Sequence, residues 1–151
     1  DVNIIPSPYL SGAMDEFFDM PLSPMIETTR GCPFSCTFCA DGIASKNKVA
    51  KFESQRVRDE LHYMGERMKN VDELTVTDLN FGMYKWDSET ARYIAEVQAE
   101  HGWPSLVRAS AGKNRPERIM ETASLLKGSW VIGSSVQSSD QEVLKNIKRF
   151  N

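Results

Sequence analysis

The hydrophobic pattern of this chain changes repeatedly between short apolar runs and longer stretches with helical periodicity. The apolar runs predict strands at Met25–Thr29, Glu73–Thr77, Ser105–Ala109 and Trp130–Ser135. The periodic stretches predict helices at Ser54–Asn70, at about Ser88–Glu100 and from near Asn114 to Gly128, with a further helix opening at a capping box, Ser139–Glu142. Strands and helices therefore alternate along the chain.

This alternation, with short connections, indicates an α/β fold built from parallel βα units. About four units are too few to close an eight-stranded barrel, and an open doubly wound sheet is the other arrangement available. A last strand without a partner would leave an exposed apolar edge. We therefore expect residues 25–151 to be the N-terminal part of a truncated partial parallel (β/α) barrel, whose remaining strands lie beyond Asn151.

The first 24 residues have a different character. Prolines at positions 6, 8, 21 and 24 prevent one long regular element, although a short helix over Met14–Phe18 fits between them. We expect residues 1–24 to form a linker or a wrapping arm.

Composition narrows the class of protein. The net charge is −3, with acidic and basic residues mixed, so nucleic acid is not expected as an obligatory partner. The apolar runs are too short to span a membrane, and the first residues do not resemble a signal peptide. The chain has three cysteines within eight positions, which argues against a disulfide framework and for a cytoplasmic, reducing location.

The three cysteines, Cys32, Cys36 and Cys39, follow the first predicted strand with the spacing Cys-x3-Cys-x2-Cys. Each iron of a [4Fe–4S] cluster is normally held by one thiolate, so three thiolates leave one iron open to an outside ligand. A zinc site is the alternative, but it requires a fourth ligand. The two histidines of the chain, His62 and His101, are distant in sequence.

This spacing, with Phe38 in the aromatic position before the last cysteine, resembles the hallmark of the radical SAM superfamily. The resemblance implies a [4Fe–4S] cluster that binds S-adenosylmethionine (SAM) at its open iron. It also implies reductive cleavage of SAM to a 5′-deoxyadenosyl radical, with electrons from a donor such as flavodoxin or ferredoxin. The radical then takes hydrogen from a substrate.

The same resemblance implies SAM contacts in the loops after the later strands. The segment after the second strand departs from the family's Gly-Gly-Glu but offers polar groups for the SAM amino group. Alternation places Arg108 on the same strand face as Ser110, at the ribose position. An arginine near the chain's end matches a position that pairs with the SAM carboxylate. The residues implied are Phe38, Asp78, Asn80, Gly82, Ser110, Gln137 and Arg149.

The segments Ile5–Leu10 and Glu27–Pro33 resemble radical SAM proteins that carry a cobalamin-binding domain. This resemblance implies a cobalamin-linked enzyme that methylates or rearranges a small-molecule substrate, with cobalamin held by a domain not in this chain. A methylthiotransferase acting on tRNA or protein is an alternative, because it shares the Thr-Arg-Gly-Cys segment. A non-catalytic iron–sulfur module for electron transfer is another alternative, and it predicts a fourth protein ligand.

Overall fold

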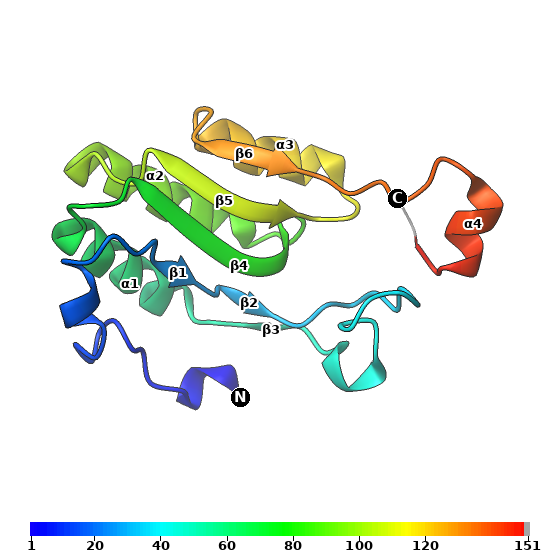
Figure 1. Cartoon of the computed structure of the whole chain (residues 1–151), viewed down its shortest axis with the longest axis horizontal. Helices are drawn as coiled ribbons and strands as arrows, with labels where there is room; N and C mark the ends of the chain where they lie inside the picture. The colour runs from blue at the N-terminus through cyan, green and yellow to red at the C-terminus, as the bar shows by residue number, and fades with distance from the viewer. Residues whose placement is uncertain (150–151) are drawn as a thin grey trace.

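The computed structural model describes residues 1–149 and contains a sheet of four parallel strands (Figure 1). Their spatial order is β1-β4-β5-β6, so each strand pairs with the next parallel strand along the chain. The bounds are Met25–Ile26 for β1, Glu73–Phe81 for β4, Leu106–Ala111 for β5 and Trp130–Gly133 for β6. The parallel α/β architecture expected from the sequence is confirmed.

Helices α1, Ser54–Arg67, α2, Asp87–His101, and α3, Pro116–Leu125, lie side by side on one face of the sheet (Figure 1). Their apolar faces pack on the sheet and form the core, which includes Leu61, Met64, Ile94, Val97, Leu74, Val76 and Val107. A short helix, α4, Gln141–Asn146, lies beyond the end of β6 (Figure 1). Within residues 1–149, no helix combines the length and the apolar character needed to cross a membrane.

The two faces of β4 have different neighbours. Leu74 and Val76 are buried in the core, and Asp78 and Asn80 continue this buried row at the strand's C-terminal end. Thr77 and Leu79 point to the opposite, exposed face, as the period of two requires. The strand therefore continues through Phe81, although the sequence predicted a loop from Asp78 onward.

The first predicted strand, Met25–Thr29, is divided in two. Only β1 pairs with β4, while β2, Thr29–Arg30, forms an antiparallel pair with β3, Ala50–Lys51, which the sequence analysis did not predict. The division occurs at Thr28, whose backbone N–H donates to the Asp78 carboxylate instead of to a strand partner. The buried carboxylate of Asp78 thus takes the hydrogen bond that a neighbouring strand would otherwise accept, and the regular pairing of β1 ends before the cysteine loop.

Several other boundaries differ from the predictions by a few residues. Helix α1 ends at Arg67 instead of Asn70, and β6 ends at Gly133 instead of Ser135. The expected capping box beginning at Ser139 is wrong by one residue. The cap of α4 is Asp140, whose carboxylate accepts from the N–H groups of Glu142 and Val143.

The N-terminal segment packs against the rest of the fold. It contains two short 3-10 helices, Val2–Ile4 and Asp15–Phe17, the second lying inside the expected helix Met14–Phe18. The rings of Tyr9 and Phe18 are buried in the core, and the Tyr9 hydroxyl donates to the carbonyl of Met25 at 2.6 Å. A domain limit between residues 24 and 25, and further strands beyond Asn151, stay predictions.

The carboxyl of Asp87, at the start of α2, is buried, and burial raises its pKa from 3.8 to about 7. Asp87 therefore holds a proton in the folded chain but not in the unfolded chain between about pH 4 and pH 7, and its contribution to stability falls as pH rises through this window. We expect Asp87→Asn to raise the free energy of unfolding at pH 8 by on the order of 2 kcal/mol, with a smaller change at pH 4. Urea denaturation at both pH values measures this difference.

The exposed Asp19 provides the matched control. Asp19→Asn is expected to change the free energy of unfolding by less than ~0.5 kcal/mol at either pH. An Asp87→Asn protein that is less stable than the wild type at pH 8 would contradict the prediction.

Candidate functional site

The three cysteines lie on one loop that leaves β2 and ends at the short 3-10 helix Ala44–Lys46. The N–H of Cys39 donates to the carbonyl of Cys36 at 3.2 Å, and the N–H of Gly42 donates to the carbonyl of Cys39 at 3.0 Å. These successive turns coil the loop tightly. All three thiols are free, with Cys32 and Cys36 buried and Cys39 partly exposed.

Two glycines allow the loop to coil this closely. A Cβ on Gly31, which has a φ of +97°, would lie 2.2 Å from the carbonyl oxygen of Lys48. A Cβ on Gly42 would lie 2.2 Å from the carbonyl oxygen of Cys36. Because no side chain fits at these distances, both positions require glycine.

Hydrogen-bond donors lie close to the sulfurs of Cys32 and Cys39. The amide Nδ2 of Asn80 lies 3.4 Å from Cys32 Sγ, and Lys113 Nζ lies 3.6 Å from the same sulfur. Lys113 Nζ also donates to Asn80 Oδ1 at 2.9 Å, and the N–H of Asp41 donates to Cys39 Sγ at 3.4 Å. Such donors stabilise the negative thiolates of Cys32 and Cys39, and together with the free thiol of Cys36 they make a loop that fits a [4Fe–4S] cluster.

A cavity of about 240 Å³ lies beside the cysteine loop. It brings two of the cysteines together with four of the predicted SAM-contacting residues, although these come from the cysteine loop, the end of β5, and the segments that follow β6 and α4. Besides these, the lining holds no other cysteine or histidine among the described residues. The lining residues are Cys36, Phe38, Cys39, Leu79, Ser110, Ala111, Lys113, Gly133, Ser135, Gln137 and Arg149.

Arg149 reaches this cavity because the segment after α4 is attached to the cysteine loop. The N–H of Thr37 donates to the carbonyl of Ile147 at 3.0 Å, and the N–H of Arg149 donates to the carbonyl of Leu144 at 2.9 Å. The guanidinium donates to the carbonyl of Ser135, and the residue is only 7% exposed. A buried guanidinium at the wall of a cavity is suited to bind a carboxylate.

Gln137 adopts an uncommon backbone conformation at the same cavity. Its φ is +72°, in the left-handed region that most side chains avoid. Phe38 is 53% exposed beside the two cysteines, so its ring is available to a bound molecule. Gln137 and Phe38, both predicted to contact SAM, therefore lie at the cavity wall.

Asp78 and Asn80 are not among the residues that line this cavity, because they lie on the buried face of β4. Asp78 accepts hydrogen bonds from the N–H and hydroxyl of Thr28, at 2.7 and 2.5 Å. Burial raises its pKa to about 6, and the hydrogen bonds from Thr28 oppose this rise. In this structure, Asp78 and Asn80 hold the cysteine segment against β4, and their contact with SAM stays a prediction.

Gly82 does not line this cavity either. A Cβ there would lie 3.1 Å from Trp130 Cη2 and 3.2 Å from Ile119 Cα, so this glycine allows α3 and β6 to approach the end of β4. Close approach at Gly82 was expected, but its neighbours are apolar side chains of the core. Its contact with SAM likewise stays a prediction.

Lys113 was not singled out by the sequence analysis. It lies in the loop after β5, and its position just after a predicted strand was the signal that could have identified it.

Arg108 does share a strand face with Ser110, as alternation predicted. Its guanidinium pairs with the Glu73 carboxylate at 2.7 Å and faces a neighbouring hollow.

Known proteins resemble this chain over nearly its whole length. Residues 26–151 match the model of the radical SAM superfamily. The 2-(S-pantetheinyl)-carbapenam-3-carboxylate methyltransferase of Streptantibioticus cattleyicolor is 37% identical over 97% of this chain. The cobalamin-dependent radical SAM methyltransferase TokK of Streptomyces tokunonensis is also 37% identical over 97% of the chain. The chain spans 22% of the length of each of these relatives.

A solved structure has the same fold. The cobalamin-dependent radical SAM enzyme OxsB, with aqua-cobalamin and SAM bound, superposes with a TM-score of 0.63 over 97% of this chain and 22% of its own. The two sequences are 17% identical, so this likeness concerns the fold. It confirms the partial barrel expected from the sequence. Fold, cysteine spacing and family match agree, and the chain belongs to the radical SAM superfamily.

Proposed function

We propose that this chain is the catalytic core of a cobalamin-dependent radical SAM methyltransferase that acts on a small-molecule natural product. Cys32, Cys36 and Cys39 hold a [4Fe–4S] cluster, and SAM occupies the adjoining cavity. In this proposal residues 25–151 are the N-terminal part of the barrel, and cobalamin binds to a domain outside this chain. An electron donor such as flavodoxin or ferredoxin reduces the cluster in the cytoplasm.

One observation carries the proposal, namely that a single cavity joins Cys36 and Cys39 to Ser110, Gln137 and Arg149. A molecule bound there meets the cluster on one side and polar side chains on the other. SAM has matching groups, with an amino acid moiety that can reach an open iron and a ribose that hydrogen-bonds to hydroxyl and amide groups.

When bound, the reduced cluster supplies the electron that cleaves the sulfonium C–S bond of SAM. The chain's own residues position the reactants. Arg149 binds the SAM carboxylate, Ser110 and Gln137 hydrogen-bond to the ribose, and the ring of Phe38 covers the cluster side of the cavity. Lys113 and Asn80 donate toward Cys32 and partly neutralise its negative charge.

Methyl transfer is favoured because both relatives described above are named as methyltransferases. The name of TokK and that of the OxsB structure both include cobalamin. None of these three names describes a methylthiotransferase, so the methylthiotransferase alternative is less well supported. An electron-transfer module would require a fourth protein ligand, and no other cysteine or histidine lines the cavity among residues 1–149.

Electron paramagnetic resonance tests the proposal on the anaerobically reconstituted and reduced protein. We expect SAM to shift the g values of the reduced cluster, because its amino and carboxylate groups become ligands of the open iron. Methylthioadenosine lacks these groups and should leave the signal unchanged. A signal that does not respond to SAM would contradict the proposal.

The ammonium group of Lys113 should raise the reduction potential of the cluster, because it favours the more negative reduced state. We expect Lys113→Met to lower this potential by on the order of tens of millivolts. Redox titration followed by electron paramagnetic resonance measures the change. Lys69→Met, at an exposed position after α1, is the control and should leave the potential unchanged.

A further inference from the structure

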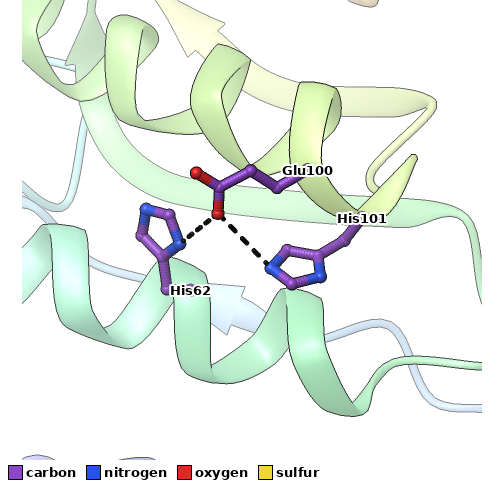
Figure 2. Close-up of side chains that lie close together, drawn as sticks. All are labelled: His62, Glu100 and His101. Atoms are coloured by element: carbon purple, nitrogen blue, oxygen red, sulfur yellow. Dashed lines mark ion pairs between the residues drawn. The ribbon is translucent and has the colours of Figure 1, made fainter.

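Two helices bring a second set of metal-binding side chains together, outside the cysteine site. His62 of α1 and His101 of α2 both approach the carboxylate of Glu100 (Figure 2). Glu100 Oε2 lies 3.2 Å from His62 Nδ1 and 3.7 Å from His101 Nε2. One ligand atom from each residue lies within 4.8 Å of the others. His62 thus meets the adjacent residues Glu100 and His101, far from it in sequence, in a compact three-ligand cluster.

Gly65 allows the two helices to approach closely enough for this contact. A Cβ on Gly65 would lie 2.5 Å from Val97 Cγ1 and 3.0 Å from His101 Cδ2. A larger residue would displace the side chains of Val97 and His101, and His101 belongs to the cluster. The close packing of the helices therefore creates the cluster.

The second nitrogen of His62 also has the surroundings of a metal-bound histidine. His62 Nε2 is buried and has no hydrogen-bond partner among the described residues. The nearest carboxylate oxygen is Glu96 Oε2, at 3.8 Å, and Arg58 Nε holds this carboxylate at 3.0 Å. Histidines that bind a metal generally donate their other N–H to a carboxylate, and Glu96 supplies a carboxylate on this side of His62.

We propose that His62, Glu100 and His101 bind one Zn²⁺ ion that links α1 to α2. Two imidazoles and a carboxylate are a donor set that zinc prefers, and water takes the fourth position. Zinc bonds of about 2.0–2.1 Å place tetrahedral ligand atoms about 3.4 Å apart, close to the 3.2 and 3.7 Å found here. The site is independent of the proposed methyltransferase activity.

The location separates this ion from the proposed methyltransferase site. The cysteine loop and its cavity lie at the C-terminal ends of the strands, whereas His101 is the last residue of α2, a helix that starts at that edge and runs away from it. An ion here binds two helices of the outer layer and does not touch the cavity. It should therefore stabilise the folded chain without entering the reaction.

Zinc titration of the cluster-loaded protein tests the proposal, because the cluster then occupies the cysteines. We expect one equivalent of Zn²⁺ to bind and to raise the unfolding temperature. His62→Gln and His101→Gln should each weaken binding by at least ~10-fold, and Glu96→Gln by about 10-fold. Glu66→Gln, an exposed carboxylate elsewhere on α1, is the control and should bind zinc as the wild type does.

X-ray absorption at the zinc edge provides a second measurement that does not depend on the variants. Nitrogen and oxygen neighbours with the outer-shell signal of imidazole support the site. Sulfur neighbours would show that zinc occupies the cysteines and would overturn it. The proposal is also overturned if the wild type binds no zinc, or if the folded histidine variants bind it with unchanged affinity.

Discussion

Cys36→Ala is expected to abolish normal loading of the iron–sulfur cluster. The cysteine loop offers three thiols, and loss of one leaves two irons without a protein ligand. Cys36 is buried at the cavity wall, and the chain has no fourth cysteine whose sulfur could replace it. Iron and sulfide analysis after anaerobic reconstitution, together with the visible absorption of the cluster, measures the loss.

Ser35→Ala, at the exposed position directly before Cys36, is the matched control. It removes one hydroxyl from the same loop, as Cys36→Ala removes one thiol, and should leave the iron content unchanged. If Cys36→Ala protein held as much iron and sulfide as the wild type, the assignment of Cys36 as a ligand would be wrong.

Arg149→Ala is expected to weaken SAM binding about 10–100-fold without loss of the cluster. A charge-assisted hydrogen bond contributes about 1.5–3 kcal/mol, and 1.4 kcal/mol corresponds to a factor of ten in affinity. Arg149 lies at the cavity wall, and its guanidinium is positioned by the carbonyl of Ser135. Calorimetric titration of the cluster-loaded protein with SAM measures the dissociation constant.

Arg149→Lys separates the contribution of charge from that of geometry. A lysine retains the charge but loses the two-pronged hydrogen bonding of guanidinium, so its affinity should lie between those of the wild type and Arg149→Ala. Lys145→Ala, at an exposed position on α4, controls for a change in net charge. Equal SAM affinity in wild type and Arg149→Ala would remove Arg149 from the site.

The cysteine motif and the alternation of strands with helices could both be predicted from sequence because they depend on local spacing. Cys-x3-Cys-x2-Cys places three thiols on one short loop, whatever the rest of the chain does. The apolar runs and helical stretches likewise identified β4, β5, β6 and the helices between them, with errors of a few residues at their ends. Strand ends were least predictable, because tertiary hydrogen bonds decide where the ladder stops.

The buried positions of Asp78 and Asn80 could not be predicted from the local sequence pattern. Their polar character after an apolar run indicated a loop, but β4 continues past them and alternation directs both side chains to the buried face. Buried polar side chains require partners, and these came from Thr28 and Cys32, about 50 positions away. No local pattern specifies such partners.

The sequence by itself determined the α/β class and the resemblance to the radical SAM superfamily, and it predicted the three cysteines as iron–sulfur ligands, because periodicity and cysteine spacing are properties of neighbouring residues. Only the tertiary structure decided which polar residues share a cavity with the cysteines, and it added Lys113 to them. It alone also brought His62 to His101. The physical reason is that parallel strands and packed helices join residues far apart in sequence, and burial then fixes the direction in which each side chain points.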